Sequence, residues 1–277
     1  MARLDGIRRV RGRVKALRWL FSHPANRRRR LRGLYRLLAF QVQSRLNGGK
    51  PITTPIGRCS QIYAVRGMSA STKAIYGNPP DPGPMVAWQR LLRSGDLFVD
   101  IGANVGSYLL IAGEFSVDLV AVEPNGVARK WLHKNLELNS LSARVLDVAV
   151  GAAHGSERFS MGRDCTNSFD PRGEQIVTVE TLDSIIGQRR AKVKVDVEGF
   201  ELSVLEGARD ALTEQRIEAI QLEMNEDREL ICSELGHYGY DLYEATPHGD
   251  FISYGGAADL FAFPSSPTSE GGVPPSV

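Results

Sequence analysis

One stretch constrains the fold more than any other. It runs from Leu97 to Tyr108 and reads LFVDIGANVGSY. A short apolar run meets an aspartate, then a turn with spaced glycines, then the apolar pattern of a helix. This order is typical of a buried parallel strand whose carboxyl end turns tightly into a helix. Open α/β sheets bind ligands at such ends, where glycine lets the backbone approach the ligand closely. The stretch therefore indicates a nucleotide-like ligand site.

The same alternation of strand and helix continues along the chain. Apolar runs predict further strands at 119–123, near 143–150, at 192–197 and at 218–223. Helices are expected near 106–114, 127–138, 200–212 and 227–236. Residues 156–180 indicate an inserted antiparallel pair, and 240–245 with 260–263 a closing antiparallel hairpin. The pattern predicts an α/β fold with a mostly parallel, seven-stranded sheet over residues 85–264.

The segments outside this domain differ in composition. Residues 1–50 hold 15 of the 34 Lys and Arg residues and one acid, a net charge of +14, whereas the remainder carries −12. Residues 51–84 are rich in Pro, Gly, Ser and Thr and predict a linker or lid. Within them, Asn78 to Asp81 resembles the Asn-Pro-Pro-aromatic turn of amino-methylating enzymes, but Asp81 is not aromatic, so we interpret it as a proline-rich turn. Residues 265–277 predict a disordered tail.

The basic arm, residues 1–50, contains an amphipathic pattern. The apolar stripe has helical spacing and consists of Leu31, Leu34, Tyr35, Leu38, Val42 and Leu46. Such a helix can contact an anionic membrane surface or pack on its own acidic domain. Binding to nucleic acid rests on charge alone and is the weakest interpretation. The cysteines are scattered, and the sequence has neither an apolar run long enough to span a membrane nor the apolar core of a signal peptide. We therefore expect a cytoplasmic protein, with peripheral contact at the inner membrane surface as the alternative.

Two acids indicate which cofactor the first turn binds. The turn GANVG lacks the GxGxxG of a dinucleotide fold, and Asp100 stands where it would repel a pyrophosphate. Glu123 ends the next strand, 23 residues later, where a carboxylate can accept both ribose hydroxyls. S-adenosylmethionine has an ammonium group and a ribose but no phosphate, so it fits both acids. NAD fits only Glu123.

Several motifs appear together in a recognisable order. They are FVDIGANVGSY, AVEPNGVARKWLHKNLELN, VETLDS, VKVDVEGFELSVLEGA, QLEMN and DLFAFP. On these motifs, residues 86–264 resemble the FkbM family of S-adenosylmethionine-dependent methyltransferases. The resemblance implies a Rossmann-like class I methyltransferase fold and O-methylation of a sugar, a glycolipid or a related natural product.

The resemblance also implies roles for individual residues. The methionine portion of the cofactor would be held by Asp100, Gly102, Ala103, Asn104 and Gly106. The ribose would be held by Glu123 with Pro124 and Asn125, and the adenine would lie beside Ala149, which follows Asp147.

Polar residues alternate with valines in the strand at 192–197. If the strand persists, Lys194, Asp196 and Glu198 share one face near its carboxyl edge. One interpretation is an ion pair of Lys194 with Asp196 plus a helix cap. We favour the other, in which Asp196 lies beside the reacting methyl and the acceptor hydroxyl as base or orienting group. Glu198 and Glu223 are the second and third candidates for this role.

Three functions follow from these patterns, in order of preference. The first is S-adenosylmethionine-dependent O-methyl transfer without a metal; its alternative is the same transfer with Mg²⁺ held by Asp196, Glu198 and Glu223. The second is an NAD-dependent oxidoreductase, which Asp100 and the missing glycine disfavour. The third is a non-catalytic, membrane-associated protein with the same fold.

Overall fold

The computed structural model describes residues 30–159 and 175–265, together with residues 21, 23, 26 and 173. The predictions for most of residues 1–29, for the middle of the inserted pair (most of 160–174) and for nearly all of the tail fall outside the described residues.

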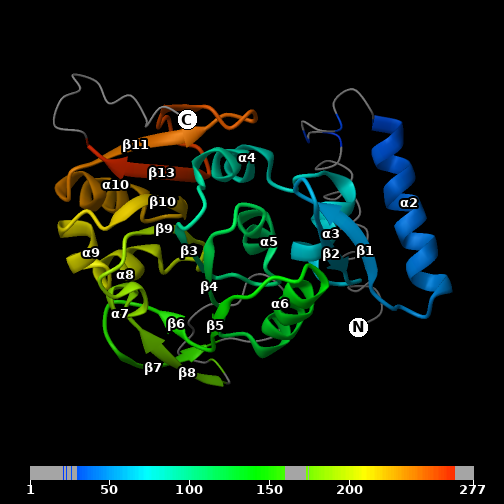
Figure 1. The fold of residues 1–277 in the computed structure, drawn as a ribbon, viewed down its shortest axis with the longest axis horizontal. Coiled ribbons are helices and arrows are strands. Elements are labelled where there is room, and N and C mark those ends of the chain that lie inside the picture. The colour runs from blue at the N-terminus through cyan, green and yellow to red at the C-terminus, as the bar shows by residue number, and fades with distance from the viewer. Residues whose placement is uncertain are drawn as a thin grey trace.

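A central sheet of eight strands organises the described part of the chain (Figure 1). Its strands are β3 (Leu97–Ile101), β4 (Asp118–Val122), β5 (Arg144–Leu146), β9 (Ala191–Val195), β10 (Ile217–Glu223), β11 (Tyr240–Ala245), β12 (Phe251–Ser253) and β13 (Asp259–Pro264). They lie in the order β12-β11-β13-β10-β9-β3-β4-β5. The strands from β10 to β5 are parallel, and β13 enters antiparallel between β10 and β11. The predicted α/β fold, its mostly parallel sheet and its antiparallel closing strands are confirmed. The sheet has eight strands rather than the predicted seven, because the short β12 adds to the edge of β11.

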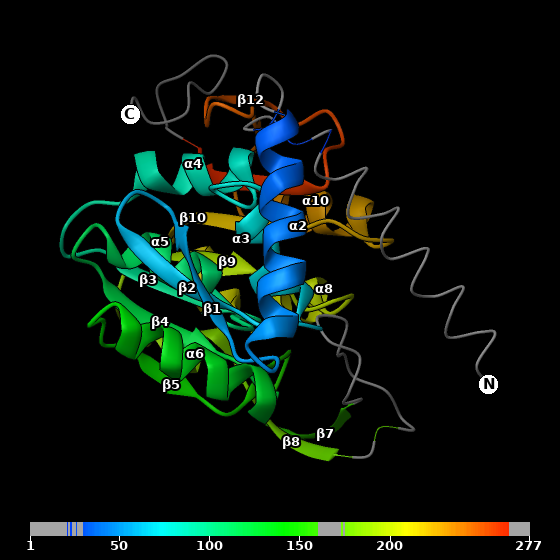
Figure 2. The same cartoon turned by 90° about the vertical axis from the view of Figure 1, so that its right-hand side faces the viewer.

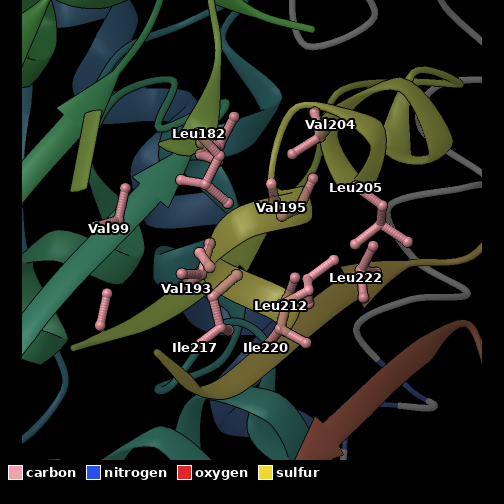
Figure 3. Close-up of a cluster of buried hydrophobic side chains, with 14 of the residues drawn as sticks. Val99, Leu182, Val193, Val195, Val204, Leu205, Leu212, Ile217, Ile220 and Leu222 are labelled. Atoms are coloured by element: carbon pink, nitrogen blue, oxygen red, sulfur yellow. The ribbon is translucent and has the colours of Figure 1, made fainter. Parts of the chain in front are cut away.

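Helices cover both faces of the sheet. One face is covered by α7 (Leu182–Ile186), α8 (Glu201–Glu206), α9 (Arg209–Thr213) and α10 (Arg228–His237), and the other by α4 (Pro82–Leu91), α5 (Ser107–Gly113) and α6 (Gly126–Leu138). Figure 3 shows the first layer, in which Val193 and Val195 of β9 meet Val204 and Leu205 of α8. On the second face Trp88 of α4 lies edge-on to Phe98 of β3.

Strand alternation puts a polar row on the second face. Along β3 the side chains of Leu97, Val99 and Ile101 enter the first core, so Asp100 points the other way. Asp100 pairs in register with Lys194 of β9, and Lys194 with Gln221 of β10. The three side chains are buried in the middle of the sheet. The row crosses β3, β9 and β10 within two residues of their carboxyl ends, next to the site described below.

Two predicted elements are divided in the structure. The strand expected near 143–150 ends at Leu146, and β6 (Ala149–Val150) instead joins β7 (Gly155–Phe159) and β8 (Gln175–Glu180) in a separate three-stranded sheet. The helix expected at 200–212 breaks into α8 and α9. A Cβ on Gly207, between them, would lie 2.1 Å from the carbonyl oxygen of Gly151, so only glycine fits this close contact.

Residues 51–84 form a layer beside α5 and α6 (Figure 2). This layer consists of the hairpin β1 (Ile52–Ile56) and β2 (Ser60–Ala64) followed by α3 (Ser69–Tyr76). The hairpin turn is fixed by Glu114, whose carboxylate accepts hydrogen bonds from the backbone N–H groups of Arg58, Cys59 and Ser60. Helix α2 (Arg30–Leu46) packs on α3. No helix in the described part of the chain combines the length and apolar character needed to cross a membrane.

Candidate functional site

A cavity of about 240 Å³ lies at the carboxyl ends of β3, β4, β9 and β10. Nine of the predicted site residues line it, namely Gly102, Ala103, Asn104, Glu123, Pro124, Ala149, Asp196, Glu198 and Glu223. The N-terminal layer and the start of α4 close the cavity with Ala70, Lys73, Pro80, Asp81 and Met85. The cavity therefore has one wall from the first two strand ends and a second wall from β9, β10 and the N-terminal layer.

The turn after β3 brings three strand ends together. Gly102 has a φ of +75°, and a Cβ there would lie 1.9 Å from the carbonyl oxygen of Asp196. Its N–H and that of Ala103 both donate to the carbonyl oxygen of Val122, at 2.9 and 3.0 Å. The ends of β3, β4 and β9 are thus held in contact, and glycine is required at position 102 on both steric and conformational grounds.

Glu123 is fixed by the backbone on both of its oxygens. The N–H of Asn104 donates to Oε2 at 2.7 Å, and the N–H of Asn125 donates to Oε1 at 2.8 Å. Burial raises the pKa of Glu123, and the two hydrogen bonds oppose that shift. A carboxylate held in this way can accept hydrogen bonds from a pair of vicinal hydroxyls in the cavity.

Four predicted cofactor residues do not line the cavity, and three of them support local structure. Gly106 is the N-cap of α5. Asn125 caps α6, because its side-chain oxygen accepts hydrogen bonds from the N–H groups of Val127 and Ala128. Asp147 is exposed and pairs with Arg129 at 2.5 Å. The structure therefore places these three residues in the frame of the site rather than on its surface.

Asp100 is the fourth, and the sequence interpretation of it needs correction. We expected it to meet a cationic cofactor group, but its side chain is 1% exposed and its Oδ1 lies 3.1 Å from Nζ of Lys194. Burial raises the pKa of Asp100, and Lys194 opposes that shift. The cation that Asp100 meets is thus a lysine of the neighbouring strand, beneath the cavity wall.

Lys194 joins the two walls of the cavity. Its Nζ also lies 3.3 Å from Oδ2 of Asp196, donates to the carbonyl oxygen of Gly102 at 3.3 Å, and sits 5.1 Å from the ring centre of Tyr108. Burial alone would lower the pKa of Lys194, but the two carboxylates outweigh it and raise the pKa above its usual value. The predicted ion pair with Asp196 is present.

Asp196, Glu198 and Glu223 converge at the edge of the cavity. An oxygen from each lies within 4.8 Å of the others. The strand ends at Val195, so Asp196 and Glu198 lie in the following turn, and Glu198 has a φ of +52°. Neither Asp196 nor Glu198 forms the predicted side-chain cap of α8. Instead, the Glu201 carboxylate accepts hydrogen bonds from the backbone N–H groups of Val197 and Gly199.

The two carboxyl groups of Asp196 and Glu223 have different proton affinities. Burial alone would raise the pKa of Asp196, but the Lys194 ammonium and a hydrogen bond with Glu223 lower it below its usual value. The hydrogen bond with Asp196 and the charge of Asp196, together with burial, raise the pKa of Glu223 to about 8. At neutral pH the pair therefore holds one proton, on the Glu223 side, and one negative charge, on the Asp196 side.

Two further acids in the cavity were missed in the sequence. Asp81, in the turn interpreted as merely proline-rich, accepts a hydrogen bond of 2.5 Å from the hydroxyl of Tyr108, and burial raises its pKa. Asp259, at the start of β13, accepts a hydrogen bond of 2.8 Å from the Gln221 amide. Burial and the charge of Asp81 raise the pKa of Asp259 to about 7. The one sign of Asp259 in the sequence is that it is the polar residue at the start of the otherwise apolar run DLFAFP.

The two walls offer different chemistry. The wall formed by the turns after β3 and β4 presents backbone groups and one fixed carboxylate, which suit a neutral, hydroxyl-bearing ligand portion. The wall with Asp196 and Glu223 presents acids of shifted proton affinity, which suit proton transfer.

Comparisons with known proteins give a family match. The family model described as the methyltransferase FkbM domain matches residues 100–242. Among solved structures, a methyltransferase FkbM from Methylobacillus flagellatus KT is 19% identical with a TM-score of 0.44, and the match covers 63% of this chain and 45% of that one. This chain therefore spans less than half the length of that protein.

Two other solved structures are similar at lower identity. A precorrin-6y C5,15-methyltransferase from Geobacter metallireducens GS-15 is 14% identical with a TM-score of 0.40, covering 65% of this chain and 87% of that one. A TehB-like SAM-dependent methyltransferase from Corynebacterium glutamicum is 12% identical with a TM-score of 0.42, covering 70% and 93%. No curated protein matches the chain.

Proposed function

We propose, from the premise that this chain belongs to the FkbM family of S-adenosylmethionine-dependent methyltransferases, that it methylates a hydroxyl of a sugar, a glycolipid or a related natural product. Its fold is the Rossmann-like class I methyltransferase fold. Membership of this family sets the NAD-dependent and non-catalytic interpretations aside. The observation that carries the choice of a hydroxyl is the position of Asp196, ionised and hydrogen-bonded to Glu223 at the cavity edge.

The residues of the first wall fit the cofactor. Glu123 would accept the ribose hydroxyls, and the turn from Gly102 to Asn104 would approach the methionine portion through its backbone. Ala149 and Pro124 would lie against the adenine side. When bound, the cofactor supplies an electrophilic methyl group carried on a sulfonium.

The second wall would prepare the acceptor. Asp196 accepts the hydrogen bond of the acceptor hydroxyl and so orients its oxygen toward the methyl carbon. When the acceptor oxygen takes up the methyl group that the bound cofactor would supply, the carboxylate of Asp196 would accept the proton that this hydroxyl gives up. A positioned carboxylate of this kind contributes about 10²–10⁴-fold to the rate.

The other acids support a hydroxylated acceptor. Asp81, Glu223 and Asp259 line the same side of the cavity, and each offers oxygens that accept hydrogen bonds from neighbouring hydroxyls. An acceptor with a phosphate or carboxylate at this position would meet repulsion from the ionised carboxylate of Asp196.

A divalent cation held by Asp196, Glu198 and Glu223 is the alternative way to activate the hydroxyl. The two schemes differ in their response to metal removal. If Lys194 and the shared proton already balance the charge, we expect EDTA to leave methyl transfer unchanged. A loss of transfer that added Mg²⁺ restores would favour the metal.

The acceptor can be identified by comparing cells with and without the protein. We expect mass spectrometry of extracted glycolipids and metabolites to find a species lighter by one methyl group when the protein is absent. Complementation with the wild type should restore the heavier species, and Asp196→Asn should not. A restored methyl group on nitrogen or carbon rather than oxygen would contradict the proposal.

A further inference from the structure

Helix α2 has apolar side chains on two opposite faces. On the inner face, Leu37 and Phe40 are buried, and Phe40 packs with Ala64 of β2 and Ile75 of α3. On the outer face a second apolar row follows the helical spacing. It consists of Leu31 (83% exposed), Tyr35 (72%), Leu38 (55%), Val42 (54%) and Leu46 (83%). We call this row the α2 stripe.

The α2 stripe is nearly the whole of the pattern seen in the sequence. One interpretation of that pattern was that the helix packs on the chain's own acidic domain. The helix does pack on the rest of the chain, but through its inner face, and the α2 stripe stays exposed. Figure 1 places α2 at the edge of the molecule beside β1 and α3, and Figure 2 shows it running along that side. A row of five large exposed apolar side chains on one helix indicates a surface that binds a membrane or another molecule.

The charge around the stripe selects an anionic partner. Helix α2 has four arginines in 17 residues and no acid. Arg36 and Arg45 are exposed. The first 50 residues together carry a net charge of +14. An apolar stripe flanked by arginines is the arrangement that places a helix in the plane of an anionic bilayer, with the apolar side chains at the acyl boundary and the cations at the headgroups.

Other occupants fit these observations less well. Pairing of α2 with α2 of a second copy would bring eight arginines together with no acid in either helix. The other large apolar side chains exposed in the described residues, such as Leu230 on α10 and Ile252 on β12, stand singly and offer no matching stripe. Nucleic acid would use the arginines but leave the leucines exposed to water.

We propose that the α2 stripe docks the protein on the surface of an anionic lipid bilayer, with α2 lying parallel to it. At about 1.5 Å per residue the helix would lie along roughly 25 Å of membrane without crossing it. This inference does not depend on the acceptor proposed above. It does place α3, which contributes Ala70 and Lys73 to the cavity, on the membrane-proximal side of the molecule.

Co-sedimentation of the full chain with vesicles tests the proposal. The vesicles are phosphatidylcholine alone and an equimolar mixture of phosphatidylcholine and phosphatidylglycerol. We expect binding to the mixed vesicles only, weakening as salt is raised. The double variant Leu38→Ser/Val42→Ser should reduce the partition coefficient about tenfold or more, because two half-exposed apolar side chains no longer enter the bilayer.

The matched control is Leu230→Ser/Ile252→Ser, whose side chains are 57% and 51% exposed on other elements. We expect it to bind as the wild type does, and both double variants to keep the wild-type Tm because all four positions are exposed. Equal partition of the two double variants, or no binding to the mixed vesicles, would overturn the proposal. A lipid-free dimer, or an RNA complex, that only Leu38→Ser/Val42→Ser disrupts would overturn it too.

Discussion

The two walls of the cavity are built by different means. The wall that we propose binds the cofactor, called the cofactor wall below, comes from the turns after β3 and β4. Its one carboxylate, Glu123, is held by backbone N–H groups that lie within 19 residues of it. The opposite wall, which we propose binds the acceptor and call the acceptor wall, draws on segments as distant in sequence as Ala70 and Asp259, and its acids are held by other charged or polar side chains. One wall is fixed by backbone geometry and the other by electrostatics.

This difference predicts how each wall responds to change. Among substitutions only proline removes a backbone N–H group, so the cofactor wall should keep its shape in most variants. The acceptor wall depends on the balance of Lys194 against several acids, so single substitutions should shift proton affinities there. Lys194 links the two walls, because its ammonium group contacts both the carbonyl oxygen of Gly102 in one wall and the carboxylate of Asp196 in the other.

The largest expected effect is on the acceptor wall alone. Asp196→Asn removes the carboxylate that we propose accepts the hydroxyl proton but keeps the size of the side chain. We expect kcat for methyl transfer to fall by about 10²–10⁴-fold. Binding of S-adenosylhomocysteine, measured by calorimetry, should be unchanged, because the cofactor wall does not use this carboxylate. A parallel loss of cofactor binding would show that the walls are not separable.

Lys194→Met tests the point where the walls meet. It leaves Asp100 buried without its cation, and breaking such a pair costs about 3–5 kcal/mol of unfolding free energy. Urea denaturation measures this loss. The double variant Lys194→Met/Asp100→Asn should recover much of the lost stability, because no unpaired buried charge remains. If the double variant is no more stable than the single one, Asp100 is not the group that Lys194 neutralises.

Glu123→Gln acts on the cofactor wall alone. The new amide group would face one of the two backbone N–H donors, of Asn104 or Asn125, and so lose a charge-assisted hydrogen bond. We expect the affinity for S-adenosylhomocysteine to fall about 10–100-fold, as measured by calorimetry. Asp147→Asn is the control: this side chain is exposed and pairs with Arg129 outside the cavity, so affinity should be unchanged.

The contrast between the walls also explains what the sequence could predict. The parallel strands were visible as apolar runs, and Gly102 and Glu123 as residues at the ends of two of them. The division of the helix at 200–212 was not visible, because Gly207 is required by contact with Gly151, which is distant in sequence. The separate pairing of β6 likewise depends on β8, 25 or more residues away.

In the acceptor wall, the sequence predicted only the residues that lie at or just after the end of a strand. Asp196, Glu198 and Glu223 were found this way, and the structure brings them together. Asp81 was not found, since nothing local distinguishes it from other turn residues. Asp259 was not found either, since its place at the start of the apolar DLFAFP run gives no sign that it faces a cavity. The partner of Asp100 follows from strand register, which places β9 beside β3 although Lys194 lies 94 residues after Asp100. A sequence pattern cannot give that register by itself.

The smallest effect we expect is a dependence on pH that belongs to the acceptor wall. Glu223 has a pKa of about 8, and while protonated it donates to Asp196 and weakens Asp196 as a base. Loss of this proton should raise kcat/KM about tenfold between about pH 7 and about pH 9. The folded state holds this proton more tightly than the unfolded chain, so stability should fall as pH rises toward 8. Glu223→Gln keeps the hydrogen bond but cannot ionise, so the rise in kcat/KM should disappear. A rise that persists in Glu223→Gln and is lost in Asp259→Asn, whose carboxyl has a pKa of about 7, would assign the titration to Asp259 instead.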